Sequence, residues 1–185
     1  MKLFDLIKSR RSIMPNQYNE SPIEEIKLNK VLEVANFAPT HKKTEPWRFK
    51  VFKKKSKEEL AFFLADKYQK TTEKFSKFKY EKIKEKVNKS SVVIAICMQR
   101  DPKNSIPEWE ELASVAMAVQ NMWLMASDLK IGSYWSSPPI MKYFGDHIPL
   151  VEGEKCLGFF YMGNYTGEII SKISSPFEDK IERFY

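Results

Sequence analysis

Glycine, cysteine and histidine are scarce in this chain of 185 residues, which has six, two and two of them respectively. Neither Gly-x-Gly-x-x-Gly nor a P-loop occurs, so the glycine-rich phosphate cradles of those motifs are excluded. No His-x-x-x-His, Cys-x-x-Cys or carboxylate cluster is present, and we predict no metal site. Gly-x-Ser-x-Gly is also missing, although spacing alone leaves a Ser-His-Asp arrangement open. If the protein is an enzyme, these absences favour a bound cofactor as its reactive group, and we name no catalytic residue.

Long apolar runs are missing too, since none approaches the length of a membrane span. Residues 1–8 alternate charged with apolar side chains, which is not the pattern of a signal peptide. Cys97 and Cys156 lie in apolar runs without the spacing or neighbours of a disulfide or metal pair. We interpret them as inert core thiols in a reducing compartment, and we expect a soluble cytoplasmic protein with no membrane partner.

The composition is that of a folded protein with a basic surface. Hydrophobic residues make up 43% and aromatic residues 14%, which argues against disorder. The length suits one domain with a real core, and no repeat, linker or composition shift divides residues 1–185. Lys and Arg number 31 against 24 Asp and Glu, a net charge of +7. This excess suits nucleic acid, anionic lipid or a small phosphorylated ligand, and does not choose among them.

Apolar periodicity predicts buried strands between helices. The predicted strands are residues 47–51, 92–98 and 156–162. Two of the predicted helices begin with a capping box: one from Ser21 to Glu24, running to about Asn36, and one from Ser56 to Glu59. The strongest apolar periodicity predicts a long helix from about Glu110 to Lys130. The other predicted helices are a short one from residue 3, a Lys-dense one over 67–89 and a short one over 140–144. Residues 132–135 are interpreted as the turn that leaves the long helix. We expect one α+β domain with helices on both sides of a sheet.

Two segments are candidates for ligand binding. Arg10, Arg11 and Ser12 combine two guanidinium forks with a hydroxyl, which suits a phosphate. The same arginines also suit a basic last turn that complements a helix dipole. Residues 38–49 form a polar loop, bounded by prolines, that leads into an aromatic strand. By itself this loop fits either a ligand-binding role or a simple connector.

Together these segments resemble the nitroreductase family. Arg-Arg-Ser near the N-terminus is followed by Ala-Pro, a polar loop, and Pro-Trp-Arg-Phe entering a strand. The helix over 118–122, the segment 131–135 and the strand over 157–163 are similar to that family's central helix, the turn after it and its late strand. The matches run from residue 2 to about 165 in the family's order. The His41-Lys42 loop and the Pro107-x-Trp109-Glu110 segment look most like its compact, single-domain members.

The resemblance implies a nitroreductase-like α+β fold with a central, mostly antiparallel sheet flanked by helices. It also implies an intertwined homodimer with FMN between the two subunits. The residues that match the family's cofactor-binding positions are Arg10, Arg11 and Ser12 for the FMN phosphate and ribityl chain, His41 for the FMN of the other subunit, and Trp135, Ser136 and Ser137 for the flavin ring.

Some positions depart from the family's pattern. Lys43 stands where Asn is usual, and Glu45 stands where Gln is usual. Lys43 would either stabilise the anionic reduced flavin or point to solvent. Many members also place a late basic residue on the phosphate, and the candidates for that role, none in a recognisable motif, are Lys172, Lys180 and Arg183.

The implied activity moves reducing equivalents from NADH or NADPH, through FMN, to a small-molecule acceptor such as a nitroaromatic or quinone. Two alternatives stay open. Phe75, Phe78 and Tyr80, interleaved with lysines, would suit a basic nucleic-acid-binding module. A solvated amphipathic helix is the simpler account of that segment, so we expect no nucleic-acid partner. The second alternative is an FMN-binding protein without reductase activity.

Overall fold

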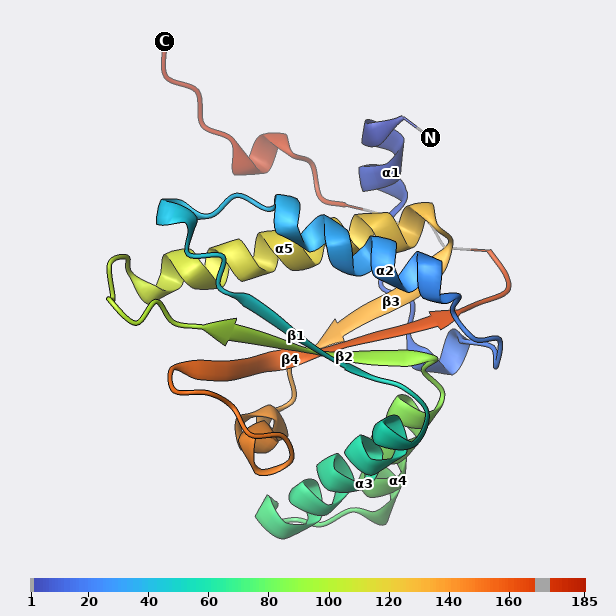
Figure 1. Cartoon of the computed structure of the whole chain (residues 1–185). Coiled ribbons are helices and arrows are strands. Elements are labelled where there is room, and N and C mark those ends of the chain that lie inside the picture. Colours follow the sequence, from blue (N-terminus) through green and yellow to red (C-terminus); the bar gives the residue numbers. More distant parts are fainter. Residues whose placement is uncertain (1, 169–173) are drawn as a thin grey trace.

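The computed structural model describes residues 2–168 and 174–185. Within them the centre is a four-stranded sheet in the order β1-β2-β4-β3, and every neighbouring pair is antiparallel (Figure 1). The strands are β1 (Trp47–Phe52), β2 (Val92–Gln99), β3 (Ile131–Ser136) and β4 (Glu154–Asn164). The predicted α+β fold with an antiparallel sheet is confirmed.

Strands β2 and β4 lie in the middle of the sheet and are covered on both faces. Residues 92–98 of β2 are each no more than 1% exposed. Ile94 lies opposite Phe160 of β4, which in turn lies opposite Trp135 of β3. A continuous apolar run is what a strand between two helical layers requires, so the pattern over 92–98 already implied this position.

Helical layers cover the two faces of the sheet (Figure 1). One layer contains α2 (Glu25–Glu33), the 3-10 turn η2 (Val34–Phe37) and α5 (Glu108–Asp128). The other contains α3 (Lys54–Thr71), α4 (Lys77–Asn88) and the 3-10 segment η4 (Pro139–Asp146). Each layer has its own core, because alternate strand side chains point to opposite faces: Ile94 and Phe160 toward α5, and Val93 and Tyr161 toward α3.

The two ends of the chain lie beyond α5, on the side away from the sheet (Figure 1). Helix α1 (Leu3–Ser9) is short and buries none of its residues. The tail carries the 3-10 turn η5 (Glu178–Lys180) and is exposed. Lys172, one of the late basic residues considered for the phosphate, lies outside the described residues.

The two cysteines face each other across β2 and β4. Cys97 is the register partner of Cys156, next to a shift of register between Ile96 and Cys97. Both thiols are free and buried, as the interpretation of core cysteines predicted.

The predicted capping box at Ser21 is wrong. Helix α2 begins at Glu25, four residues later, and Glu24 before it is extended and makes no side-chain cap bond. The reason is tertiary: Ile23 N donates to the Ser91 hydroxyl at 2.9 Å, and the Ile23 side chain is buried. This contact holds the segment extended at the point where a cap would have turned it into a helix.

Other predicted boundaries also differ from the structure. The Lys-dense helix predicted over 67–89 is divided, since α3 ends at Thr71 and α4 begins at Lys77. Helix α3 begins at Lys54, and Ser56 bonds back to Lys53, accepting from its N at 3.2 Å and donating to its O at 2.9 Å, so Ser56 lies inside the first turn. Residues 132–135 belong to strand β3 and are not a turn, because β4 has a free edge there with which they pair.

Candidate cofactor site at the edge of strand β3

The segment after α1 is fixed along the outer edge of β3. Ile13 N donates to Ser133 O at 3.1 Å, and the Tyr18 hydroxyl lies 2.8 Å from Ile13 O and 3.0 Å from Tyr161 O. The Tyr18 ring packs in space that glycine leaves, since a Cβ on Gly163 would lie 2.5 Å from ring carbons. A larger residue there would displace Tyr18 and loosen the segment.

Arg10 points inward from this segment. Its guanidinium lies over the Trp123 ring of α5, 4.6 Å from the centroid, and its Nη1 is buried with no hydrogen-bond partner among the described residues. Burial, and then the charge of Arg11, lower the pKa of Arg10. A buried guanidinium nitrogen without an acceptor is costly, and a bound anion would supply the missing acceptor.

Arg11 behaves differently from its neighbour. Its Nη1 donates to Lys8 O at 2.8 Å and to Arg10 O at 2.6 Å, so it satisfies carbonyls at the C-terminal end of α1. Each of the two interpretations of the Arg-Arg pair therefore fits one residue. Arg11 bonds carbonyls at the C-terminal end of α1, and Arg10 is the residue that is available to a ligand.

Ser12 and Arg11 line a cavity of about 230 Å³, and Arg10 is not among its lining residues. The Ser12 side chain is exposed. The cavity is formed between the segment after α1 and the chain that follows β4, and its other lining residues include Gln17, Tyr165, Thr166 and Glu168. Arg10 and Ser12 thus come from one short segment held against the sheet edge, with hydroxyl and guanidinium groups close in sequence.

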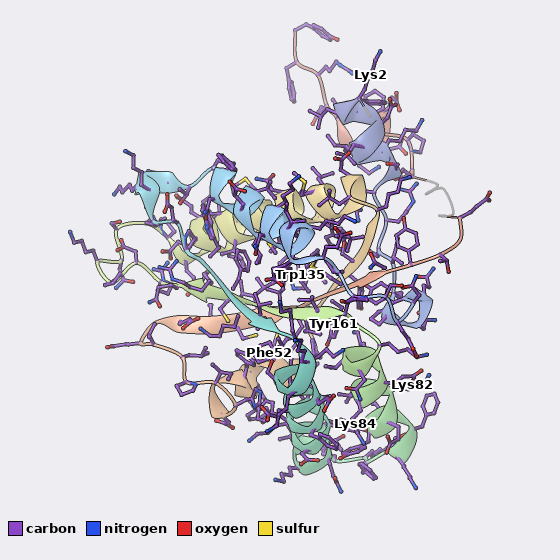
Figure 2. The ribbon with its side chains drawn as sticks, turned by 45° about the vertical axis from the view of Figure 1, so that its right-hand side comes forward. Lys2, Phe52, Lys82, Lys84, Trp135 and Tyr161 are labelled. Carbon is purple, nitrogen blue, oxygen red and sulfur yellow. The ribbon has the colours of Figure 1, made fainter. Side chains whose placement is uncertain are left out.

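Trp135, Ser136 and Ser137 lie at the far end of β3. The Trp135 indole donates to Leu157 O at 3.3 Å and packs against the core on the α5 side, whereas Ser136 lines a cavity on the α3–α4 side. Figure 2 labels Trp135 and, on the opposite side of the sheet, Tyr161. Ser137 follows the strand and is exposed. A planar ligand that met all three would therefore have to lie at the edge of the sheet, because Trp135 and Ser136 project from opposite faces.

Gly158 makes this end of β3 possible. It has a φ of +133°, and a Cβ there would lie 2.5 Å from Ser136 O and 2.7 Å from the Trp135 indole nitrogen. Only glycine permits β4 to approach β3 so closely at the candidate site.

His41 lies apart from the other candidates within one chain. It belongs to η3 (His41–Lys43), is exposed, and its Nδ1 is 2.5 Å from Glu110 Oε2 in the first turn of α5. Arg10 contacts Trp123, near the other end of that helix. At 1.5 Å per residue the two points on α5 are about 20 Å apart, so a single chain does not bring His41 to Arg10.

The loop that carries His41 has an unusual backbone. Lys42, Lys43 and Glu45 have φ values of 51°, 54° and 42°, in the left-handed region that residues other than glycine seldom adopt. Lys42 Nζ donates to Ser105 O at 2.8 Å, and Glu45 N donates to the Thr40 hydroxyl at 3.2 Å. Lys43 and Glu45 have exposed side chains. Such strain persists where surrounding contacts enforce it, and it is concentrated at functional loops.

Sequence reasoning missed two residues that organise the site. Trp123 belongs to the apolar stripe of the long helix and resembles an ordinary core residue, and Tyr18 lies in no motif. Neither carries a signal in the sequence that would connect it with Arg10 or Ile13. Among the described residues, no group of three His, Cys, Asp or Glu side chains could hold a metal. In the same part of the chain, no helix is both long and apolar enough to cross a membrane.

Comparison with known proteins gives consistent matches. A family model described as the nitroreductase family matches residues 7–164. The Bacillus subtilis (strain 168) protein named "Putative NAD(P)H nitroreductase YfhC" is 29% identical over 140 residues, which cover 75% of this chain and 71% of that protein. The Escherichia coli (strain K12) protein named "Putative NAD(P)H nitroreductase YdjA" is 25% identical over 183 residues, which cover 95% of each chain.

Solved structures share the fold. A nitroreductase-like family protein from Bacillus cereus superposes with a TM-score of 0.83 at 24% identity, covering 100% of this chain and 96% of that one. A Desulfovibrio desulfuricans structure described as "a putative nitroreductase in complex with fmn" has a TM-score of 0.72 at 21% identity, covering 100% and 98%. At these identities the similarity establishes the fold.

Proposed function

Because this chain belongs to the nitroreductase family, we propose that it is an FMN-dependent oxidoreductase. Its electron donor is NADH or NADPH, and its acceptors are nitroaromatics, quinones or similar electron-poor small molecules. The names of its relatives support the donor, since they are called NAD(P)H nitroreductases, and a structure of the same fold is described in complex with FMN.

The observation that carries the proposal is the buried Nη1 of Arg10, which has no acceptor among the described residues. A phosphate presents several anionic oxygens, and a guanidinium bonds them with charge assistance. The Ser12 hydroxyl follows two residues later beside its cavity. The residues at this edge of the sheet therefore fit the phosphate end of FMN.

Further residues would hold the rest of the cofactor. Ser136 and Ser137 offer hydroxyls at the end of β3, and the Trp135 indole, bonded to Leu157 O, is held rigidly beside them. When bound, FMN supplies hydride acceptance and donation, which no side chain provides. The chain's own task is to orient the cofactor and to admit flat acceptors, with Trp135 limiting access to the ring.

We further propose that the enzyme is a homodimer with FMN at the interface. His41 lies about 20 Å from the position of Arg10 along α5, so it would complete the site of a second copy. The outward side of α5 supports an interface, because it exposes apolar side chains, whereas a helix surface that faces water usually carries charged ones. The side chains of its exposed apolar stripe are Trp109, Leu112, Ala116 and Met117. The two free, buried cysteines agree with the reducing cytoplasm that we propose as its compartment.

The nucleic-acid alternative rests on the α3–α4 pair. Phe75 and Phe78 are 51% and 73% exposed. Several lysines of α4 are nevertheless neutralised within the helix. The ion pairs are Lys82 and Lys89 with Glu85, and Lys84 with Glu81. This pairing is that of a solvated amphipathic helix, and it leaves fewer cations for a phosphate backbone.

A spectrum of the purified protein tests the proposal. We expect a yellow protein with a flavin absorbance band, and bleaching of that band when NADH or NADPH is mixed in without oxygen. A colourless protein that does not take up added FMN and is retained on DNA would contradict the proposal in favour of the nucleic-acid module. Bound flavin that neither NADH nor NADPH reduces would leave an FMN-binding protein without reductase activity.

A further inference from the structure

The positive charge of the protein is concentrated on the hairpin that α3 and α4 form. Residues 67–89 contain nine lysines and three glutamates, an excess of six positive charges, whereas the whole chain has a net charge of +7. The hairpin extends from the face of the sheet opposite α5 and both chain ends (Figure 1). Almost all of the net charge is therefore gathered on one projection of the molecule.

The tip of this hairpin combines cations with aromatic rings. It consists of five exposed residues: Lys70, Lys74, Phe75, Lys77 and Phe78. The two phenylalanines are 51% and 73% exposed. In the described part of the chain, none of the three lysines has a carboxylate partner. Glu73 is the one acidic residue between the first and the last of them, so the tip keeps a net positive charge.

The other lysines of the hairpin already have partners. Ion pairs along α4 neutralise three of them, and Lys67 pairs with Asp146 at 2.6 Å. Lys79 and Lys86 lie against tyrosine rings, with their Nζ atoms 4.9 Å and 4.5 Å from the ring centroids. The charge that faces solvent without a partner is therefore that of the tip.

Helix stability explains only part of this arrangement. Lys70 lies in the last turn of α3, where a cation complements the helix dipole. Lys77 lies in the first turn of α4, which has no acidic residue, and a cation there is unfavourable. Phe78 follows it and is mostly exposed, so its ring gains little from burial. A partner outside the chain accounts for these two residues, whereas the fold does not.

The residue types favour a lipid surface over other anionic partners. Protein interfaces and base recognition favour arginine, which bonds carboxylates and bases in pairs, and residues 67–89 contain no arginine. Single-stranded nucleic acid is bound in a groove that follows its backbone, whereas the tip projects from the molecule (Figure 1). Lysine ammonium groups attract anionic headgroups, and phenylalanine rings insert at the boundary between headgroups and acyl chains.

We propose that the hairpin tip binds the surface of a bilayer that contains anionic phospholipids, with its lysines at the headgroups and Phe75 and Phe78 inserted between them. The sequence predicted no membrane partner because no apolar run is long enough to span a bilayer, but contact with the surface needs no such run. Cytoplasmic leaflets carry anionic lipids, which agrees with the compartment proposed above. No tip residue belongs to the candidate cofactor site, so the surface does not depend on the proposed oxidoreductase reaction.

The test is co-sedimentation of the purified protein with lipid vesicles. One set of vesicles contains phosphatidylcholine alone, and the other contains phosphatidylcholine and phosphatidylglycerol in equal amounts. We expect binding to the anionic vesicles only. Binding at about 0.1 M salt should be lost at about 1 M, because the Debye length falls from roughly 10 Å to roughly 3 Å.

A triple variant tests the charge of the tip. Combining Lys70→Gln, Lys74→Gln and Lys77→Gln should weaken binding to the anionic vesicles about tenfold or more, since each lysine near an anionic surface adds to the attraction. The matched control removes the same charge from exposed lysines outside the hairpin, by combining Lys2→Gln, Lys30→Gln and Lys103→Gln. It should bind within about twofold of the wild type, because charges far from the membrane are screened.

Phe78→Ser tests the insertion of the ring. It should weaken binding roughly fivefold or more, because it removes apolar surface that the bilayer would bury. Phe62→Ser is the control, since Phe62 is 54% exposed in the middle of α3, eight residues or about 12 Å along the helix from Lys70. That variant should bind like the wild type.

Equal binding to neutral and anionic vesicles would overturn the proposal, and so would wild-type affinity in the triple variant. Wild-type affinity in Phe78→Ser would overturn the insertion of its ring. Failure of the wild type to bind vesicles, together with retention on single-stranded DNA, would assign the tip to nucleic acid and overturn the lipid surface. The salt dependence of the wild type needs no substitution, so it still decides the role of charge if a variant does not fold.

Discussion

The guanidinium of Arg10 lies 4.6 Å from the centroid of the Trp123 ring, which holds this half-buried cation of the N-terminal segment against the long helix α5. The Trp123 indole also donates to Arg11 O at 3.3 Å, so the same side chain positions the peptide between Arg11 and Ser12. Trp123 therefore contacts the Arg10 side chain through its ring face and the Arg11 backbone through its indole nitrogen.

Arg10→Ala should weaken FMN binding at least tenfold. The variant removes a charge-assisted bond to phosphate, which is worth about 1.5–3 kcal/mol. Fluorescence titration of FMN measures the affinity. Lys2→Ala is the control, because Lys2, labelled in Figure 2, is an exposed cation at the start of α1. Unchanged affinity in Arg10→Ala would remove the Arg10–Ser12 pair from the site.

Trp135→Phe tests the flavin-ring end of the site. Tryptophan emission of the wild type should rise when FMN is removed, since an indole beside a flavin is quenched, and the rise should be smaller in the variant. Trp47→Phe is the control, because Trp47 lies on β1, three strand spacings or about 14 Å across the sheet from β3. Equal rises in wild type and Trp135→Phe would place Trp135 away from the flavin.

Trp135→Ala should retain FMN but change the rate or the preference among acceptors. Ring contacts of this kind are worth about 0.5–1.5 kcal/mol beyond burial, which is enough to alter turnover without abolishing binding. Steady-state rates with a quinone and a nitroaromatic acceptor measure the effect. Unchanged rates with both acceptors would contradict a role in access to the ring.

Met117→Glu should convert the proposed dimer into a monomer that has lost most of its FMN. Met117 is 39% exposed on the outward side of α5, and a carboxylate there would be buried without a partner in a dimer interface. Sedimentation and flavin absorbance are measured together. Val151→Glu introduces the same charge at a residue that is 64% exposed and outside α5, and should have no effect. A wild-type monomer with stoichiometric FMN would contradict the interface.

Lys86→Met should stabilise the ligand-free protein at pH 7 by roughly 1–2 kcal/mol, after allowance for solvent screening. Burial lowers the pKa of Lys86 from 10.5 to about 8 in the folded chain. Between pH 8 and 10.5 the unfolded chain therefore binds more protons than the folded chain. The free energy of unfolding of the wild type should rise with pH over this range, and its difference from that of the variant should shrink. Denaturant unfolding at pH 7, 9 and 10.5 measures the difference. A difference that does not change with pH would contradict the lowered pKa, and Lys82→Met is the matched control.

Residue type and periodicity by themselves determined the central strands and the long helix. The run over 92–98 has no polar residue, and only a strand covered on both faces satisfies it. The first residue of a helix was harder to predict, because it can depend on a hydrogen bond to a residue that is distant in the sequence. Ser21 and Glu24 have the spacing of a capping box, yet the bond from Ile23 to Ser91 holds that segment extended.

The sequence also determined that Arg10, Arg11 and Ser12 suit a phosphate, since that property belongs to the side chains themselves. It did not separate Arg10 from Arg11, which are chemically identical neighbours. Their roles diverge because one guanidinium meets Trp123 and the other meets the carbonyls at the end of α1. Likewise Lys86 and Lys82 belong to one lysine-dense run, and only the packing of α4 on the sheet places Lys86 against two tyrosines while Lys82 meets Glu85 near solvent. Hydrogen bonds and charges act over a few ångströms in space, so partners that are distant in sequence were decided by the tertiary structure.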